Sequence, residues 1–541
     1  MAPYKGFTTV ELRKPTRSTF DLSHEKRLST RIGRLTPIFV TETLPNDTFH
    51  GSTEILLKLA PMFAPIFHRL NLYVHYFFVP NRLLWDEWEE FITGGRLGET
   101  VQTPPVPPRI VVEQMLALNN NVMDIGSMCD YFGIPPIPDS ALAGGTWAGI
   151  TLDAMPFAAW YQIWYDYYRD RNFYADNDVL PLISGPNNGD NFMSTTWSRL
   201  WQHDYFTSAL PWTQRGAEVL LPLQGTGTVN YMPSSIFLDT ATDAAFAGDN
   251  AMGTNASTPT LKNITLPGAV FGSAGRIENI QDVTIDNSEV SINDLRRAVS
   301  LQQWLERNAL AGSRYNESIM AHFGRKTSDS RLQRAEYLGG GKAVVQISEV
   351  MTTAYSADAD DVVVPPANPT GRGSTYSDIN KFSYNCEEHG FIIGVMSCMP
   401  SSSYMQGLPR MFQQRNSFYE YPWPTFAHLG EQELFTNEIY MDPTTMSISR
   451  SDQNVFGYQS RYADWKYIPS STHGDFRTTL EDWHLTRKFA VQPNLNYNFL
   501  AFEDELQDRI FNVEGVDTMW CYIYNKINVK RSLPYFGTPM L

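Results

Sequence analysis

The sequence predicts a mainly β protein, a β-sandwich interrupted by long connections. The chain of 541 residues contains 34 prolines and 36 glycines, and this content favours short strands and many turns over long helices. Its strand-like segments lie far apart, and each is too short to be stable alone, so they must pair across long connections. A hydrophobic content of 42% and a charged content of 18% are typical of a folded chain.

Five segments have strand patterns. Residues 53–61 alternate apolar and polar side chains, which is typical of a strand with one buried face. Residues 70–80 are apolar on both faces and therefore predict a strand that is buried on both sides. The remaining candidates are residues 344–353, 390–400 and 520–529.

Two segments have helical patterns. In residues 156–170 the aromatic side chains recur every three or four positions and form one stripe, for which core or subunit packing is the favoured role and base stacking the alternative. In residues 295–312 the apolar positions also share one face, and Gly312 is placed to end the helix. We therefore expect helices within the long connections of the sandwich.

The first 34 residues are basic, whereas the whole chain has a net charge of −16. They carry eight basic side chains against three acidic ones, a net charge of +5 that leaves −21 for the remainder. The basic side chains are Lys5, Arg13, Lys14, Arg17, Lys26, Arg27, Arg31 and Arg34. With little periodicity in residues 1–35, we expect a basic N-terminal arm on an acidic body, the alternative being an ordinary solvated terminus.

Residues 226–294 differ in composition from the segments on either side. They are rich in Thr, Ser, Asn, Gly and Ala, and no tryptophan occurs between Trp212 and Trp304. Eight acidic and two basic residues give this segment a net charge of −6. Such a segment can bury little apolar surface, so we expect an insertion that faces solvent. Its charged candidates are Asp239, Asp243, Asp249, Lys262, Arg276 and Asp282.

No motif predicts an enzyme or a metal site. Residues 339–343 (GGGKA) lack the first glycine and the Ser or Thr of a phosphate-binding loop, so a glycine turn before a strand is the favoured interpretation. Residues 386–389 (CEEH) are too close together for all of them to bind one ion. Residues 357–361 (ADADD) lack the glycine and distal glutamate of a calcium loop, although a bound cation is left open. We expect no cofactor.

The four cysteines and the N-terminus bear on the compartment. The cysteines are scattered without paired spacing, which argues against a disulfide framework and fits a reducing cytoplasm. Residues 1–14 contain no apolar core of signal-peptide length. We therefore expect a protein that is made in the cytoplasm.

Several long motifs resemble the major capsid proteins of microviruses, the small circular single-stranded-DNA bacteriophages, and of their gokushovirus branch in particular. The resemblance runs nearly end to end and is weak only over residues 226–294 and parts of 355–380. It is carried by FDLSHEKRLST (20–30), TETLPNDTF (41–49), LAPMFAPIFHRLNLYVHYFFVPNRLLWDEWEEFITGG (59–95), YYRDRN (167–172), LQQWLERNALAGSRYNESIMAHFG (301–324), SDSRLQRAEYLGGG (328–341), WPTFAHLGEQE (423–433), FGYQSRYADWK (456–466), HGDFR (473–477) and LPYFGTP (533–539).

The resemblance implies a single jelly-roll β-sandwich with long interstrand insertions that contain helices. It divides the chain into a basic arm (1–35), a first part of the jelly roll (36–225), an outward insertion (226–294) and the remainder (295–541). It also implies self-assembly into a T=1 icosahedral shell around circular single-stranded DNA, in the host bacterial cytoplasm, with pentamers as intermediates.

The same resemblance suggests partners for the two unusual segments. The eight basic residues of the arm become candidates for facing the DNA, together with the net-basic stretch 296–342. A small basic packaging protein is expected to supply further positive charge, and scaffolding and pilot proteins are expected partners. The insertion becomes a candidate protrusion that meets a host cell-surface receptor.

A second class of function is weighed against the capsid hypothesis. Aromatic residues make up 13% of the chain, and together with its acidity they would also suit a β-sandwich that binds or hydrolyses carbohydrate. Neither a lectin nor a hydrolase needs a basic arm or similarity to capsid proteins. The sequence therefore favours the capsid.

Overall fold

A computed structural model describes most of the chain. The described residues are 16–95, 103–112, 124–136, 150–174, 180–188, 197–217, 219, 227–229, 252–255, 258–263, 283–285, 292–311, 314–351, 356–357, 363–364, 369–441, 454–513 and 515–536. The chain divides into two compact units, one of residues 1–213 and 311–541 and the other of residues 214–310. Each unit is described by itself.

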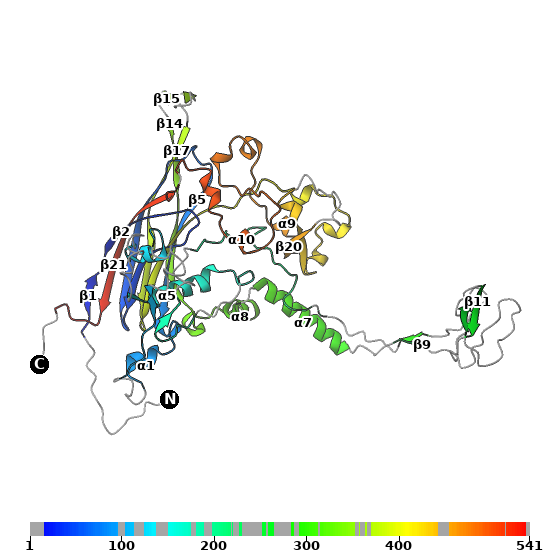
Figure 1. Cartoon of the computed structure of the whole chain (residues 1–541), viewed down its shortest axis with the longest axis horizontal. Helices are drawn as coiled ribbons and strands as arrows, with labels where there is room; N and C mark the ends of the chain where they lie inside the picture. The colour runs from blue at the N-terminus through cyan, green and yellow to red at the C-terminus, as the bar shows by residue number, and fades with distance from the viewer. Residues whose placement is uncertain are drawn as a thin grey trace, which may run out of the picture. The chain divides into compact units, whose positions relative to one another are not determined.

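The first unit is built on two antiparallel sheets, named here after their central strands (Figure 1). The β21 sheet has the order β1/β2-β21-β4-β17-β14, in which β1 and β2 lie end to end along β21. Its strands are β1 (Ser18–Asp21), β2 (His24–Thr30), β4 (Thr48–Leu59), β14 (Gln346–Met351), β17 (Pro369–Asn385) and β21 (Met519–Arg531). The β18 sheet has the order β13-β5-β18-β3, and its strands are β3 (Thr36–Thr43), β5 (Leu70–Pro80), β13 (Glu336–Val344) and β18 (Gly390–Pro400).

This strand order is that of a jelly roll. When β1 and β2 are taken as one strand and β14 as an addition at the edge, four long strands remain in each sheet. Apart from β5 and β13, which are neighbours in one sheet, each long strand is followed along the chain by a strand of the other sheet. Every pairing within the two sheets is antiparallel. A double sheet of this kind is the architecture of many viral capsid domains.

The space between the sheets is the main core. Residues from both sheets meet there, including Phe49 and Ile523 from the β21 sheet and Val74 and Ile392 from the β18 sheet. A buried hydrogen-bond chain also crosses the core. The Tyr76 hydroxyl donates to Thr53 Oγ1, which donates to the side-chain oxygen of Asn525 at 2.8 Å.

The other face of the β18 sheet is covered by a second core. Here Phe77, Ile393 and Val395 pack in a cluster with Trp160 and Trp164. Trp160 lies in helix α5 (Met155–Ile163), and Trp164 begins the π-helical turn η4 (Trp164–Tyr168) that continues it. Figure 1 shows α5 on the opposite side of the sandwich from β2 and β21. Because both faces are covered, β5 and β18 are buried along nearly their whole lengths, as the sequence predicts for residues 70–80.

A third cluster packs residues of the 404–500 region with the segment around Phe206. Short elements dominate this region and the connections. The strands outside the sandwich are β6 (Arg109–Val111), β7 (Thr151–Asp153), β8 (Pro186–Asn187), β15 (Ser356–Ala357), β16 (Val363–Val364), β19 (Glu431–Phe435) and β20 (Val455–Ser460). The helices are α1 (Trp88–Thr93), α3 (Met128–Phe132), α8 (Tyr315–Phe323), α9 (Ala463–Lys466), α10 (Tyr497–Leu500) and α11 (Glu505–Asp508).

The second unit holds two short strand pairs and a helix. Strand β9 (Gly227–Val229) pairs with β12 (Val283–Ile285), and β10 (Met252–Asn255) pairs with β11 (Thr258–Asn263). Helix α7 (Ile292–Ala311) leads back to the first unit, close to the helix expected at 295–312.

Two expectations differ from the structure. Residues 18–30, expected in an extended arm, form β1 and β2 because β21 offers them a complete ladder of backbone partners. The expected glycine turn at 339–343 is instead part of β13. A Cβ atom on Gly340 would lie 2.1 Å from the Val74 carbonyl oxygen of β5, so glycine permits the close pairing of the two strands.

Candidate functional site

The pairing of β2 with β21 decides where the basic residues of the N-terminal segment lie. Side chains alternate between the two faces of a strand, so Lys26 and Arg27 point in opposite directions. Lys26 turns inward, where its Nζ donates to the carbonyl oxygens of Pro37 (3.2 Å) and Tyr131, and burial lowers its pKa to about 8. Arg27 turns outward and stays largely exposed.

The other described candidates have partners within the chain. Arg17 donates to the carbonyl oxygens of Asn46 and Lys530 and to Thr48 Oγ1. Arg31 pairs with Asp508, and Arg34 forms a two-nitrogen contact with one carboxylate oxygen of Asp504, at 2.8 and 3.2 Å. Lys5, Arg13 and Lys14 lie outside the described residues. The structure therefore leaves Arg27 as the most exposed of the five described basic residues.

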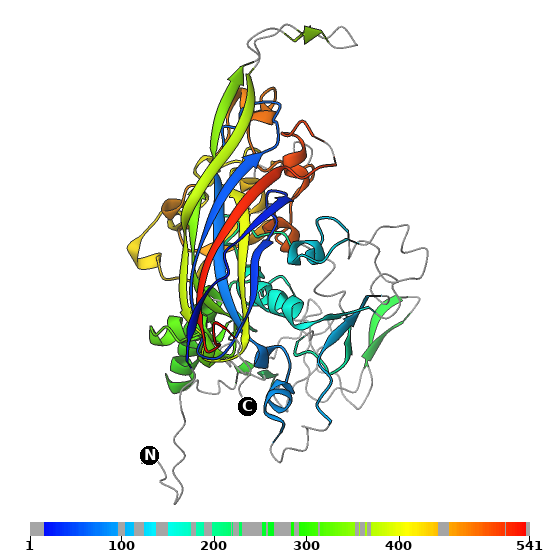
Figure 2. The same ribbon diagram turned by 90° about the vertical axis from the view of Figure 1, so that its left-hand side faces the viewer.

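Arg27 belongs to the outward face of the β21 sheet, which Figure 2 turns toward the viewer. Alternating burial along β4 and β21 shows that every second side chain leaves the core. The described charged residues of this face are six cations (Arg27, Lys58, Arg372, Lys381, Lys526, Lys530) and four anions (Asp21, Glu25, Glu54, Asp378). Three large aromatic side chains of this face are also exposed: Trp520, Tyr522 and Tyr376.

Sequence reasoning missed this face. The signal was present in residues 520–530, where Trp520, Tyr522, Lys526 and Lys530 all fall on the polar phase of an alternating pattern. The sequence does not say which residues of β4 and β17 lie beside them. That information comes from the strand register.

The protrusion candidates fall within the second unit, residues 214–310. Lys262 lies in β11. Asp239, Asp243, Asp249, Arg276 and Asp282 lie outside the described residues.

A second exposed aromatic surface lies on residues 411–429 of the first unit. These residues form short 3₁₀ turns, including η7 (Phe418–Glu420) and η8 (Pro424–Phe426). The large apolar side chains that stay exposed here are Met411, Phe412, Phe418, Tyr419, Tyr421, Trp423 and Leu429. Apolar surface of this density is typical of sites where another macromolecule binds.

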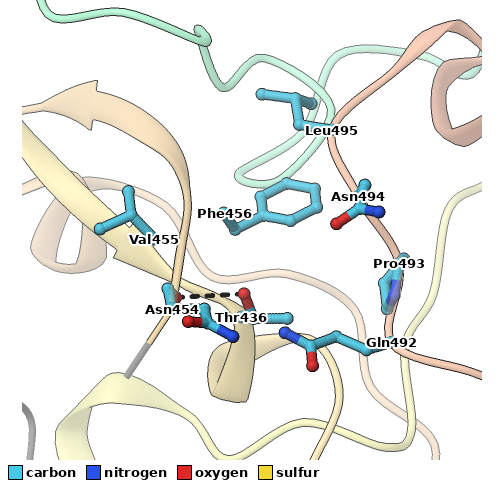
Figure 3. Close-up of a pocket in the computed structure, with 8 residues that line it drawn as sticks. All are labelled: Thr436, Asn454, Val455, Phe456, Gln492, Pro493, Asn494 and Leu495. Atoms are coloured by element: carbon cyan, nitrogen blue, oxygen red, sulfur yellow. Dashed lines mark hydrogen bonds between the residues drawn. The ribbon is translucent and has the colours of Figure 1, made fainter. Parts of the chain in front are cut away.

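A small cavity of about 310 Å³ lies beside β20 (Figure 3). Its lining offers hydrogen-bonding groups but no titratable side chain: Thr436, Asn454, Val455, Phe456, Gln492, Pro493, Asn494 and Leu495. The Thr436 hydroxyl donates to the Asn454 carbonyl oxygen at 3.1 Å. Without a carboxylate pair, the cavity does not fit the glycan-hydrolysing alternative.

Two histidines, His68 and His484, form hydrogen bonds with backbone groups through both ring nitrogens. His68 Nε2 lies 2.5 Å from the Ser401 carbonyl oxygen, its Nδ1 accepts from the Leu485 N–H, and desolvation lowers its pKa. His484 is held in the same way by Phe476 and Thr486, with a lowered pKa for the same main reason. Within the described ranges, no three His, Cys, Asp or Glu side chains are placed to hold a metal ion.

The two sheets make this a jelly-roll β-sandwich, an architecture of viral capsid domains that lectins and cupins share, and its exposed aromatic surfaces are typical of contact between macromolecules. The sequence matches the capsid protein (F protein) family over residues 8–541, so the chain belongs to this phage capsid family. It is 33% identical to capsid protein VP1 of Chlamydia phage 1, covering 99% of this chain and 97% of the relative. It is also 33% identical to capsid protein VP1 of Bdellovibrio phage phiMH2K (92% and 90%) and 26% identical to that of Spiroplasma virus 4 (97% and 95%).

Family membership gives the chain a structural, non-enzymatic role as a virion component that assembles into a capsid enclosing phage DNA. The first two relatives are capsid proteins of gokushoviruses, the branch that the sequence motifs indicate. No described helix is both long and apolar enough to cross a membrane.

Proposed function

We propose that this capsid protein closes into a T=1 icosahedral shell around circular single-stranded DNA, with pentamers as intermediates. The main support is the jelly-roll unit of a chain that belongs to a phage capsid family, together with the exposed aromatic surface of residues 411–429. Exposed apolar surface of this kind is where the subunits of a closed shell can contact one another. Electron microscopy of particles from infected cells tests it; particles of another triangulation number contradict the proposal.

The segment before β1 is proposed to face the packaged DNA, together with a small basic packaging protein. The support is its charge, since Lys5, Arg13 and Lys14 precede the first strand of an acidic protein. Replacing these three residues with Ser should lower the DNA content per particle, because each lost phosphate contact weakens binding. Arg17 is left intact because it contacts Asn46, Thr48 and Lys530. Unchanged DNA content at low and high salt contradicts the role.

The insertion 226–294 is proposed to meet a host cell-surface receptor. Its support is its richness in Thr, Ser, Asn, Gly and Ala, its net charge of −6 and its place within a separate compact unit. Three copies around a threefold axis would turn a weak contact into an avid one. Replacing residues 230–290 with a short Gly/Ser linker should leave particles intact while adsorption to host cells falls sharply. Normal adsorption of the shortened particles contradicts the attachment role.

Scaffolding and pilot proteins complete the proposed set of partners. Their support is family membership. Mass spectrometry of immature and mature particles should find them as separate chains, and their absence from both would contradict this part of the proposal.

A further inference from the structure

The exposed residues of the β21 sheet form two neighbouring rows that run across the strands. Strand register places Arg27, Tyr522, Leu56 and Tyr376 side by side, from β2 through β21 and β4 to β17. In the next row, Trp520 lies beside Lys58. We call these six residues the sheet-face patch. Figure 2 shows the strands that carry it at the front of the molecule.

The patch combines flat aromatic surface with two cationic side chains, Arg27 and Lys58. Tyr376 is 61% exposed, Trp520 42% and Tyr522 36%, so all three rings are accessible while they are held on a rigid sheet. Trp520 and Tyr522 are two residues apart on one strand, which separates them by about 6.8 Å. The Arg27 guanidinium lies 5.5 Å from the centre of the Tyr522 ring.

The positive and negative side chains around the patch lie in different rows of the sheet. The two rows of the patch contain Arg27 and Lys58 and no carboxylate of their own, and the Asp517 carboxylate accepts at 2.6 Å from Ser29, which lies beside Trp520 at the β2 end of the second row. The following row contains Glu25 and Glu54, which lie on either side of Tyr524. Both carboxylates interact within the sheet: Glu25 pairs with Arg27 at 2.9 Å, and Glu54 accepts from the Tyr376 hydroxyl at 3.0 Å. An anionic chain would therefore cross the strands along the patch and avoid the row of carboxylates.

We infer that the sheet-face patch binds single-stranded nucleic acid, with bases stacked on Trp520, Tyr522 and Tyr376 and phosphates placed near Arg27 and Lys58. Single-strand binding surfaces combine these two features, aromatic platforms for bases and cations for the backbone. Every base has a flat face, so the patch binds without reading sequence. The inference rests on the proposed function, in which the chain encloses single-stranded DNA.

A second copy of the chain is the other candidate occupant, and the position of Lys58 argues against it. Lysine is depleted in protein interfaces, although tyrosine, tryptophan and arginine are enriched there. In the patch, Lys58 lies directly beside Trp520.

The binding test uses the full-length chain as unassembled subunits and a fluorescent oligo-dT strand of about 20 nucleotides. The double variant Trp520→Ala/Tyr522→Ala should bind about 10-fold more weakly or worse, because two stacking platforms are lost. The matched control Phe418→Ala/Trp423→Ala removes two exposed aromatic side chains elsewhere and should change the affinity less than about 2-fold. Arg27→Gln/Lys58→Gln should reduce the slope of log K against log salt by about 1.4, since each single-strand phosphate contributes about 0.7.

Unchanged affinity of the Trp520/Tyr522 variant, with its unfolding midpoint preserved, would overturn the inference. Ultraviolet crosslinking in intact particles gives a second readout. Crosslinks from β21 and β17 peptides to DNA support the inference, whereas chemical crosslinks from the patch to another copy of the chain overturn it and leave the proposed function standing. Wild-type particles without DNA would instead overturn the proposed function, and with it this inference.

Discussion

The two sheets of the sandwich are both antiparallel but have different surroundings. The β18 sheet has a core on each face, because the β21 sheet covers one side and α5 with its neighbours covers the other. Among the described residues, the β21 sheet has a core on one face, and its other face carries exposed aromatic and charged side chains. One sheet therefore stabilises the protein through both of its faces, whereas the other presents one exposed face on a rigid framework.

The largest effect is expected from truncations in β18, where adjacent side chains face different cores. Ile392 packs between the sheets and Ile393 packs on the α5 side, and both are fully buried. Ile392→Ala and Ile393→Ala should each lower the free energy of unfolding by about 2–5 kcal/mol. Denaturant unfolding of the unassembled chain measures both. If only one of them destabilises the protein, the view that both faces are cores is wrong.

A smaller total loss of stability is expected from truncations in β21. There, adjacent side chains should differ in their contribution to the free energy of unfolding. Ile523 is fully buried between the sheets, whereas Tyr522 is on the exposed face. Ile523→Ala should cost about 2–5 kcal/mol, and Tyr522→Ala should stay within about 0.5 kcal/mol. The same unfolding measurement separates the two variants. Equal costs at the two positions would mean that the outward face also contributes to folding.

The smallest effect is a pH dependence from the α5 side of the β18 sheet. His75 Nδ1 lies 2.7 Å from the Tyr168 hydroxyl, and desolvation, with the nearby charge of Arg199, lowers the pKa of His75 to about 4. The unfolded chain, with a pKa near 6.5, takes up the proton first. Stability should therefore fall as the pH drops from about 6.5 to about 4.

His75→Phe should flatten part of that slope, measured as the unfolding midpoint against pH. A slope remains, because His68 and His484 also have lowered pKa values. A profile that is identical in the variant and the original protein would show that His75 does not contribute. The control His50→Phe makes the same substitution at an exposed histidine on the outward face of β4 and so measures the effect of the added phenylalanine alone.

Much of the sandwich is visible in the sequence because burial leaves a pattern in short segments. The continuous apolar runs at 70–80 and 390–400 coincide with β5 and β18, and the alternating run at 520–529 lies within β21. Alternating apolar and polar residues indicate a strand with one buried face, whereas a continuous apolar run indicates a strand that is buried on both faces. The helix pattern at 156–170 is likewise confirmed, although the structure continues α5 as a π-helical turn at Trp164.

Only the tertiary structure determines which strands are neighbours. It also determines which outward-facing side chains of different strands lie side by side. Leu56, Tyr376 and Tyr522 are far apart in sequence, and only the register of β4, β17 and β21 places them in one row. The same is true of the N-terminal segment, whose composition indicates a polar arm but whose backbone finds hydrogen-bond partners along β21. A sequence determines by its local periodicity which face of each element is apolar. Pairing between distant strands depends on the whole chain closing around one core, because only that closure fixes their register.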